Sequence, residues 1–167
     1  MPASAIFLLI LASVAPKFDT PVAAGANFTV NREHAATCKL VGRMEAELEL
    51  GRRLEPGTEE TEGAEASCEY QAGPEAVLRI SLQQLEAGSD AVLEIANLKA
   101  AFPEASVCSI PDLGSTAVLV QIPGAGVQLH VMLKNGKYVL VSALGFGDNA
   151  KIAAGVQALT RKALARI

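Results

Sequence analysis

The sequence predicts an α+β fold in which helices pack on an antiparallel sheet of about six strands. Two observations lead to this prediction. Short apolar stretches are separated by turn residues such as Gly, Pro and Asn, which is typical of strands joined in hairpins. Longer stretches carry apolar residues at helical spacing and are grouped between the hairpins. The expected order, α-β-β-α-β-β-β-β-α, differs from the strict βαβ alternation of a parallel sheet.

The first helix is expected over residues 35–50. Four apolar residues recur there at helical spacing and would form one stripe: Leu40, Val41, Met44 and Leu48. Thr37 can cap the N-terminus through its hydroxyl, and Gly51 follows the last periodic residue, where a left-handed cap ends many helices. The next segment, residues 52–66, is dense in Glu and lacks the pattern of a calcium loop, so we expect a solvated loop.

The middle of the chain is expected to form a hairpin and a second helix. Residues 67–72 and 76–82 have the composition and alternation of strands, and Gly73-Pro74-Glu75 between them is a turn. Ser89 is then expected to cap a helix that ends at Phe102, because Pro103 follows. Its apolar face would consist of Ala91, Ile95, Leu98 and Phe102.

The last third is rich in strand signals. Strands are expected at residues 106–110, 116–122, 127–133 and 138–144. Asn135-Gly136 predicts a hairpin through a type I′ turn, which needs a positive φ at both residues. Asp148 or Asn149 is expected to cap a final helix that reaches the C-terminus. The inner stripe of that helix would consist of Ile152, Val156, Leu159 and Ala163.

The N-terminal segment differs from the rest of the chain. Residues 5–14 form an uncharged apolar run that is too short for a spanning helix of about 20 residues but fits the core of a secretory signal. We therefore expect a signal peptide over residues 1–24, a linker over 25–33 and a single domain over 34–167. No stable membrane span is expected after cleavage. The alternative is that the run forms a buried first strand of the domain.

The composition argues against several classes of function. The net charge is −4 and the Lys and Arg residues are scattered, so we expect no nucleic-acid partner. Trp is absent and aromatic residues make up 4%, which disfavours sites that stack sugars or bases. The spacing of the cysteines matches no zinc pattern. We expect neither a metal nor a cofactor.

The chain has three cysteines, Cys38, Cys68 and Cys108. In an exported protein one oxidised pair is the ordinary expectation, and one thiol is then left over. We favour a Cys38–Cys68 disulfide, whose closed loop would remove roughly 3.5 kcal/mol of denatured-state entropy. The alternative is three buried thiols that act as small hydrophobic residues.

The two histidines suggest no catalytic site. His34 precedes Cys38 by one helical turn, which would allow thiol–histidine chemistry, but a disulfide at Cys38 is the favoured interpretation. His130 shares one side of its strand with Gln128 and Met132, and these three residues are the candidate binding face. The alternative for His130 is an exposed strand residue with a solvated ring.

Short motifs in the domain resemble those of a known group of proteins. They lie at residues 38–40, where the first helix opens, at 67–70, at 110–117 and at 163–167. Over about residues 35–167 the chain resembles small exported bacterial proteins and lipoproteins of unknown function, including the actinobacterial LpqN-like type. The resemblance implies export, a Mog1/PsbP-like fold with an antiparallel sheet between helices, and no catalytic residues. In that pattern a C…CxY pair corresponds to Cys38 and Cys68, which supports the disulfide.

The expected function is therefore that of an exported, non-catalytic binding or accessory module in the bacterial envelope, periplasmic or secreted. Its ligand would be a protein partner or an apolar small molecule. Two alternatives are a structural subunit of an envelope assembly and an enzyme that uses a thiol or a histidine.

Overall fold

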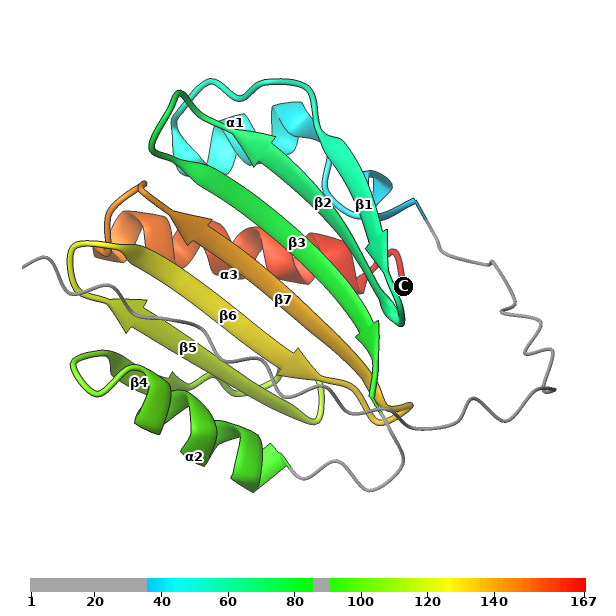
Figure 1. Ribbon diagram of the computed structural model, residues 1–167, viewed down its shortest axis with the longest axis vertical. Helices are drawn as coiled ribbons and strands as arrows, with labels where there is room; N and C mark the ends of the chain where they lie inside the picture. Colours follow the sequence, from blue (N-terminus) through cyan, green and yellow to red (C-terminus); the bar gives the residue numbers. More distant parts are fainter. Residues whose placement is uncertain (1–35, 86–90) are drawn as a thin grey trace, which may run out of the picture. The chain divides into compact units, whose positions relative to one another are not determined.

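Seven strands form one open sheet in the part of the chain that the structure, a computed structural model, describes: residues 36–85 and 91–167. The strands are β1 Thr58–Glu62, β2 Glu65–Gln71, β3 Val77–Gln84, β4 Ser106–Ser109, β5 Thr116–Ile122, β6 Gly126–Met132 and β7 Lys137–Leu144. Their order is β1-β2-β3-β7-β6-β5-β4, and all neighbours are antiparallel (Figure 1). The predicted α+β class with an antiparallel sheet is confirmed. The expected signal peptide (1–24) and linker (25–33) lie outside the described residues.

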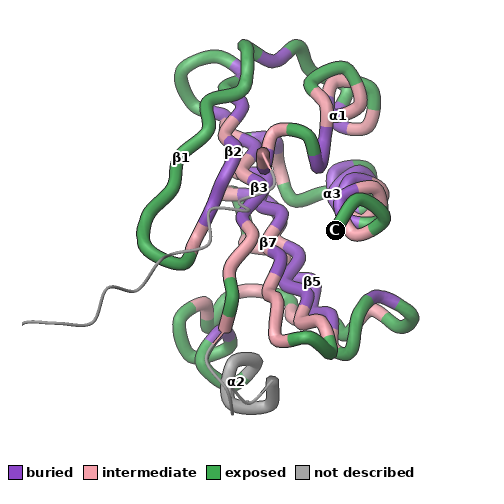
Figure 2. The backbone as a smooth tube through the Cα atoms, turned by 90° about the vertical axis from the view of Figure 1, so that its right-hand side faces the viewer, coloured by how far each residue is buried: buried purple, intermediate pink, exposed green. Residues whose placement is uncertain are grey.

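The helices lie on both sides of this sheet. They are the 3-10 helix η1 Thr37–Lys39 and the α-helices α1 Arg43–Leu50, α2 Ala91–Ala101 and α3 Ala150–Leu164. Helices α1 and α3 cover one face of the sheet, whereas α2 lies on the other side, near β4 and β5 (Figures 1 and 2). Leu98 of α2 packs there against Val118 and Val120. We call the face under α1 and α3 the apolar face and the opposite face the polar face.

The core lies between the apolar face and the two helices. Alternate residues of β2, β3, β5, β6 and β7 point to it, so that cross-strand partners such as Ile80, Val141 and Leu129 form continuous rows. Helix α3 contributes the predicted stripe, since Ile152, Val156, Leu159 and Ala163 are all buried. Asn149 caps this helix, and its side-chain oxygen accepts hydrogen bonds from the backbone N–H groups of Lys151 and Ile152.

The predicted first helix is interrupted, and its predicted stripe is wrong. The chain forms η1 and then starts a new helix after Gly42, whose N–H donates to the Glu45 carboxylate in place of the expected Thr37 cap. This break changes the phase of the helix. Leu40 and Val41 remain buried, but Met44 and Leu48 are 77% and 78% exposed. The buried residues of α1 are Ala46 and Leu50, and Gly51 ends it in a left-handed conformation as expected.

The segment expected to be a solvated loop contains strand β1, so the sheet has seven strands instead of about six. All five residues of β1 are exposed (Figure 2). An edge strand pairs on one side only, and this one, Thr-Glu-Glu-Thr-Glu, buries no side chain. Its sequence therefore lacks the apolar alternation by which strands are recognised. Backbone pairing with β2 is what makes this segment a strand.

The Asn135-Gly136 hairpin is confirmed, but its predicted type I′ geometry is wrong. Of the two residues only Gly136 has a positive φ, 77°. The loop is closed by two backbone hydrogen bonds, from Gly136 N–H to the Leu133 carbonyl and from Leu133 N–H to the Lys137 carbonyl. The connection is thus longer than a two-residue turn, and the longer loop does not require a positive φ at Asn135.

Candidate binding face on the polar side of the sheet

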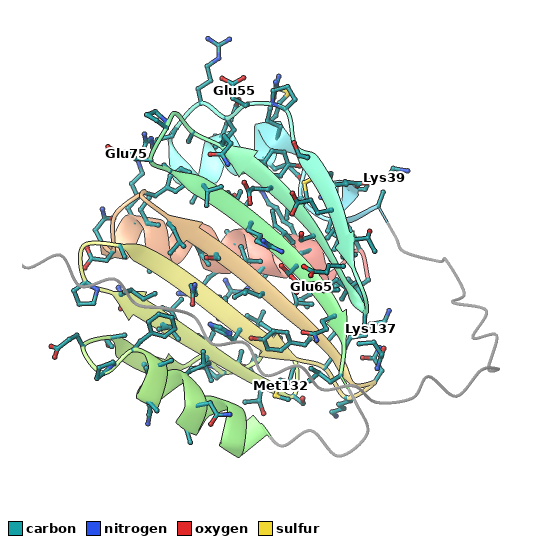
Figure 3. All side chains as sticks on the ribbon, viewed as in Figure 1. Lys39, Glu55, Glu65, Glu75, Met132 and Lys137 are labelled. Atoms are coloured by element: carbon teal, nitrogen blue, oxygen red, sulfur yellow. A yellow bond between two sulfur atoms is a disulfide. The ribbon has the colours of Figure 1, made fainter. Side chains whose placement is uncertain are left out.

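The polar face combines small hydroxyl residues with a few long polar side chains. The antiparallel register aligns Arg79, Ser142 and Gln128 in one row across β3, β7 and β6. Ser67 and Ser81 lie opposite each other on β2 and β3. Among the described helices only α2 lies on this side, at its β4–β5 end (Figure 1). In Figure 3, Glu65 on β2 and Met132 on β6 lie on this side of the sheet.

A chain of hydrogen bonds crosses β6 and β7 on this face. Nδ1 of His130 is hydrogen-bonded to the Tyr138 hydroxyl, and Nε2 lies 3.3 Å from Oε1 of Gln128. Nε2 of Gln128 in turn donates to Oγ of Ser142 at 3.3 Å. Since the amide oxygen of Gln128 can only accept, Nε2 of His130 must carry the proton. Burial lowers the pKa of His130 to about 4, so the ring is neutral near pH 7 and its Nδ1 accepts from the Tyr138 hydroxyl.

His130 is buried, so the alternative of an exposed residue with a solvated ring is wrong. Its exposed fraction is 7%. Its cross-strand neighbours are Val118 on β5 and Leu140 on β7. Burial disfavours the charged imidazolium and lowers the pKa of His130 to about 4. The ring is therefore uncharged and hydrogen-bonded at both nitrogens near neutral pH.

The structure brings together two of the three residues that the sequence singled out. Gln128 and His130 are hydrogen-bonded, whereas Met132 lies half-buried beside Tyr138 and Thr116 in the next row. Sequence reasoning missed Tyr138 and Ser142. Both lie on β7, and the strand alternation places them on one side, but only the β6–β7 register brings them beside His130 and Gln128.

A second polar group lies on β2 and β3. Nε of Arg79 donates to Oγ of Ser81 at 3.3 Å, and Nη2 lies 3.2 Å from the Glu65 carboxylate. The two charged side chains are each more than one-third exposed, so this ion pair contributes little to stability. The two contacts place the guanidinium of Arg79 between Ser81 and Glu65.

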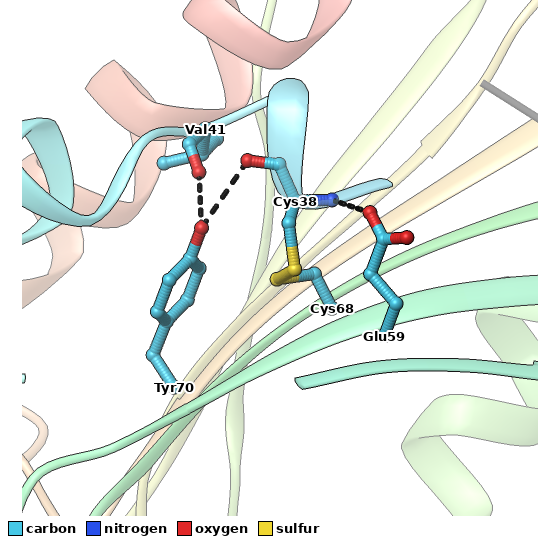
Figure 4. Close-up of a disulfide and its surroundings, with 5 residues drawn as sticks. All are labelled: Cys38, Val41, Glu59, Cys68 and Tyr70. Atoms are coloured by element: carbon cyan, nitrogen blue, oxygen red, sulfur yellow. Dashed lines mark hydrogen bonds between the residues drawn. A yellow bond between two sulfur atoms is a disulfide. The ribbon is translucent and has the colours of Figure 1, made fainter. Parts of the chain in front are cut away.

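The Cys38–Cys68 disulfide is confirmed and joins η1 to β2 (Figure 4). The Tyr70 hydroxyl donates to the Val41 carbonyl at 2.6 Å. Its oxygen also lies 3.2 Å from the carbonyl oxygen of Cys38. Burial, together with Glu59, raises the pKa of Tyr70. Gly57 lies directly over the bridge, because a Cβ there would come within 3.0 Å of both sulfur atoms.

This bridge removes one catalytic alternative. Sγ of Cys38 is bonded to Sγ of Cys68, so it is not a thiolate nucleophile beside His34, a residue that lies outside the described part. Cys108 is a free, exposed thiol on β4, so the alternative of three buried thiols is wrong. Within residues 36–85 and 91–167, no group of three or more His, Cys, Asp or Glu residues is placed to hold a metal ion.

The chain was compared with protein families, curated proteins and solved structures. No family model, curated protein or solved structure matches the chain. None of the helices that the structure describes is long and apolar enough to cross a membrane.

Proposed function

We propose that this chain is an exported accessory module of the bacterial envelope that binds a protein partner through the polar face of its sheet. The observation that carries the proposal is the difference between the two faces. The apolar face is covered by α1 and α3. The polar face carries a hydrogen-bonded row of polar side chains, and over β2, β3 and β7 no described helix covers it. Side chains held in place by hydrogen bonds lose little entropy on binding, which favours recognition.

Export is supported by the disulfide. Structural disulfides persist in oxidising compartments and are rare in the reducing cytosol. The Cys38–Cys68 bridge joins segments that are 30 residues apart and is packed under Gly57 and Tyr70. We propose a periplasmic or secreted location on this ground, together with the apolar run at residues 5–14.

The resemblance to LpqN-like exported proteins and the Mog1/PsbP-like fold also belongs to this proposal. Its support is the antiparallel sheet with helices on both sides and the Cys38–Cys68 pair. We further propose that the module is not an enzyme. His130 is desolvated and hydrogen-bonded at both nitrogens, which suits a residue that orders a surface better than one that exchanges protons with a substrate.

A second candidate function is that of a structural subunit of an envelope assembly. The exposed pair Met44 and Leu48 favours it, because these side chains lie one turn apart on the outer side of α1. In this case the contact surface would be α1 instead of the polar face.

Site-specific photo-crosslinking in cells that export the full chain separates the two candidates. A photoreactive residue at Gln128 or Gln83 reports on the polar face, one at Met44 reports on α1, and one at Ala154 on the outer side of α3 is the control. We expect a discrete adduct from the two polar-face positions and none from Met44 or Ala154. Adducts from Met44 alone would favour the structural subunit. An unprocessed N-terminus with a reduced Cys38–Cys68 pair would contradict export.

A further inference from the structure

The hairpin loop between β6 and β7 contains an asparagine followed by a glycine, Asn135-Gly136. The chain has five asparagines, and this is the one that precedes a glycine. The pair matters chemically because the backbone nitrogen that follows an asparagine can attack the side-chain amide and close a five-membered ring. Glycine favours the attack, since it has no Cβ to hinder the approach of its nitrogen. The loop is therefore a candidate for chemical modification.

The surroundings of Asn135 favour addition to its amide. The side chain is exposed, so that water reaches it. Its Oδ1 accepts a hydrogen bond from the backbone N–H of Lys137 at 3.2 Å. Negative charge develops on this oxygen when a nucleophile adds to Cγ, and a donor already in place stabilises that charge. Lys134 and Lys137, which flank the pair in the sequence, contribute positive charge that has the same effect.

One hydrogen bond opposes the reaction. The Gly136 N–H donates to the Leu133 carbonyl at 3.0 Å, and the nitrogen must leave this bond before it can attack. A single backbone hydrogen bond contributes little net free energy, so that breaking it slows the attack by about tenfold. Loops also open locally while the rest of a domain stays folded. The bond therefore delays the reaction without preventing it.

Asn149 is a matched comparison within the same chain. Its side chain is also exposed, and its Oδ1 accepts from the backbone N–H groups of Lys151 and Ile152. The residue that follows it is Ala150, which carries a Cβ and begins α3. The regular backbone of that helix fixes the position of the Ala150 nitrogen. Both amides are thus polarised by hydrogen bonds, but of the two only Asn135 is followed by an unhindered nitrogen.

We propose that Asn135 is a site of spontaneous deamidation. The Gly136 nitrogen attacks Cγ of Asn135, and its proton passes through solvent to Nδ2, which leaves as ammonia when the Cγ–Nδ2 bond breaks. The product is a cyclic imide. Water then adds to one of the two imide carbonyl carbons and breaks the bond from that carbon to the Gly136 nitrogen. Addition at Cγ gives aspartate, and addition at the main-chain carbon gives isoaspartate.

The modification changes the end of the hairpin in two ways. A carboxylate at position 135 adds a negative charge between the two lysines. Isoaspartate also inserts a methylene group into the backbone between Leu133 and Lys137, whose hydrogen bond closes the loop. This bond is weakened, because loop length decides how the two strand ends meet. The inference goes beyond the proposed function and does not depend on it.

The test follows the purified, disulfide-bonded protein during incubation in mildly alkaline buffer, since the attacking nitrogen must give up its proton. Peptide mapping by mass spectrometry measures amide loss at Asn97, Asn135 and Asn149, and enzymatic methylation of isoaspartate measures that isomer. We expect aspartate and isoaspartate to accumulate together at position 135, with no loss at the other two asparagines. A synthetic peptide of residues 133–138 sets the reference rate, and Asn135 should react within about tenfold of it, because one hydrogen bond opposes the attack.

Two variants connect the product to this residue. Asn135→Ser removes the amide and is expected to stay a single species on anion exchange, whereas the wild type gains a more acidic form. Asn135→Gln keeps an amide on a longer side chain, so the five-membered imide cannot form and the acidic form should be lost. Aspartate without isoaspartate at position 135, or an equal amount of acidic form in Asn135→Ser, would overturn the inference. A rate more than about tenfold below that of the peptide would also overturn it, because the loop would then prevent the attack.

Discussion

The two faces of the sheet are stabilised in different ways. The apolar face packs fully buried Leu, Ile and Val side chains against α1 and α3, and this burial supplies most of the stability of a domain. The polar face instead satisfies its central side chains with one another, through Tyr138, His130, Gln128 and Ser142. Such a network contributes little net free energy but fixes the positions of its members. One face can therefore carry the fold while the other holds its polar side chains in fixed positions.

The largest expected effect comes from a cavity in the apolar face. Leu129 is fully buried in β6, and Leu129→Ala is expected to lower the free energy of unfolding by about 2–5 kcal/mol, because it loses packing and leaves a void. Leu140→Ala on the polar face is the matched control, since Leu140 is only half-buried. Urea denaturation of both variants measures the difference. A comparable loss in the two variants would show that both faces carry the core.

Loss of the disulfide should come next. Cys38 and Cys68 are 30 residues apart, and the chain-entropy model gives a loss of about 3.5 kcal/mol when such a loop is opened. We expect the Cys38→Ser/Cys68→Ser variant to unfold at lower denaturant concentration, and Cys108→Ser to match the wild type because its thiol is exposed and free. A denaturant midpoint unchanged in the double variant would mean that the bridge does not stabilise the native state.

The buried histidine predicts how stability depends on pH. The folded-state pKa of His130 is about 4, below the ordinary value of 6.5, because burial disfavours its charged form. Between these two pH values the unfolded chain binds a proton that the folded chain does not, so stability falls as the pH is lowered. The loss is about 3 kcal/mol at most. In His130→Gln this part of the pH dependence should disappear. An unchanged pH profile would show that the ring is solvated in the folded state.

The smallest effect is expected from the link between α1 and α3. Arg166 donates to both carboxylate oxygens of Glu45, and this hydrogen-bonded pair, together with the Gly42 N–H, lowers the pKa of Glu45 to about 2. The contribution to stability is therefore present above pH 4.5 and is lost as the pH falls through 2. Arg166→Gln should lower the melting temperature slightly at pH 7 and leave it unchanged near pH 2. An equal decrease at both pH values would contradict a charge-based role.

The parts of the fold that depend on local pattern can be predicted from the amino-acid sequence. The hairpin at Asn135-Gly136, the cap at Asn149 and the stripe of α3 follow from turn chemistry and helical spacing. The Cys38–Cys68 bridge was also predicted, from the chain's cysteines and its resemblance to exported proteins.

Other features depend on neighbours from elsewhere in the chain and become visible only in the folded protein. The exposure of Met44 and Leu48 follows from the break at Gly42 and the docking of α1 on α3, which a continuous helical pattern does not reveal. Strand β1 exists through its pairing with β2. His130 is buried and hydrogen-bonded because the β6–β7 register sets Tyr138 and Ser142 beside it. Strand alternation tells which residues share a side, but the register, set by long-range pairing, tells which of them meet.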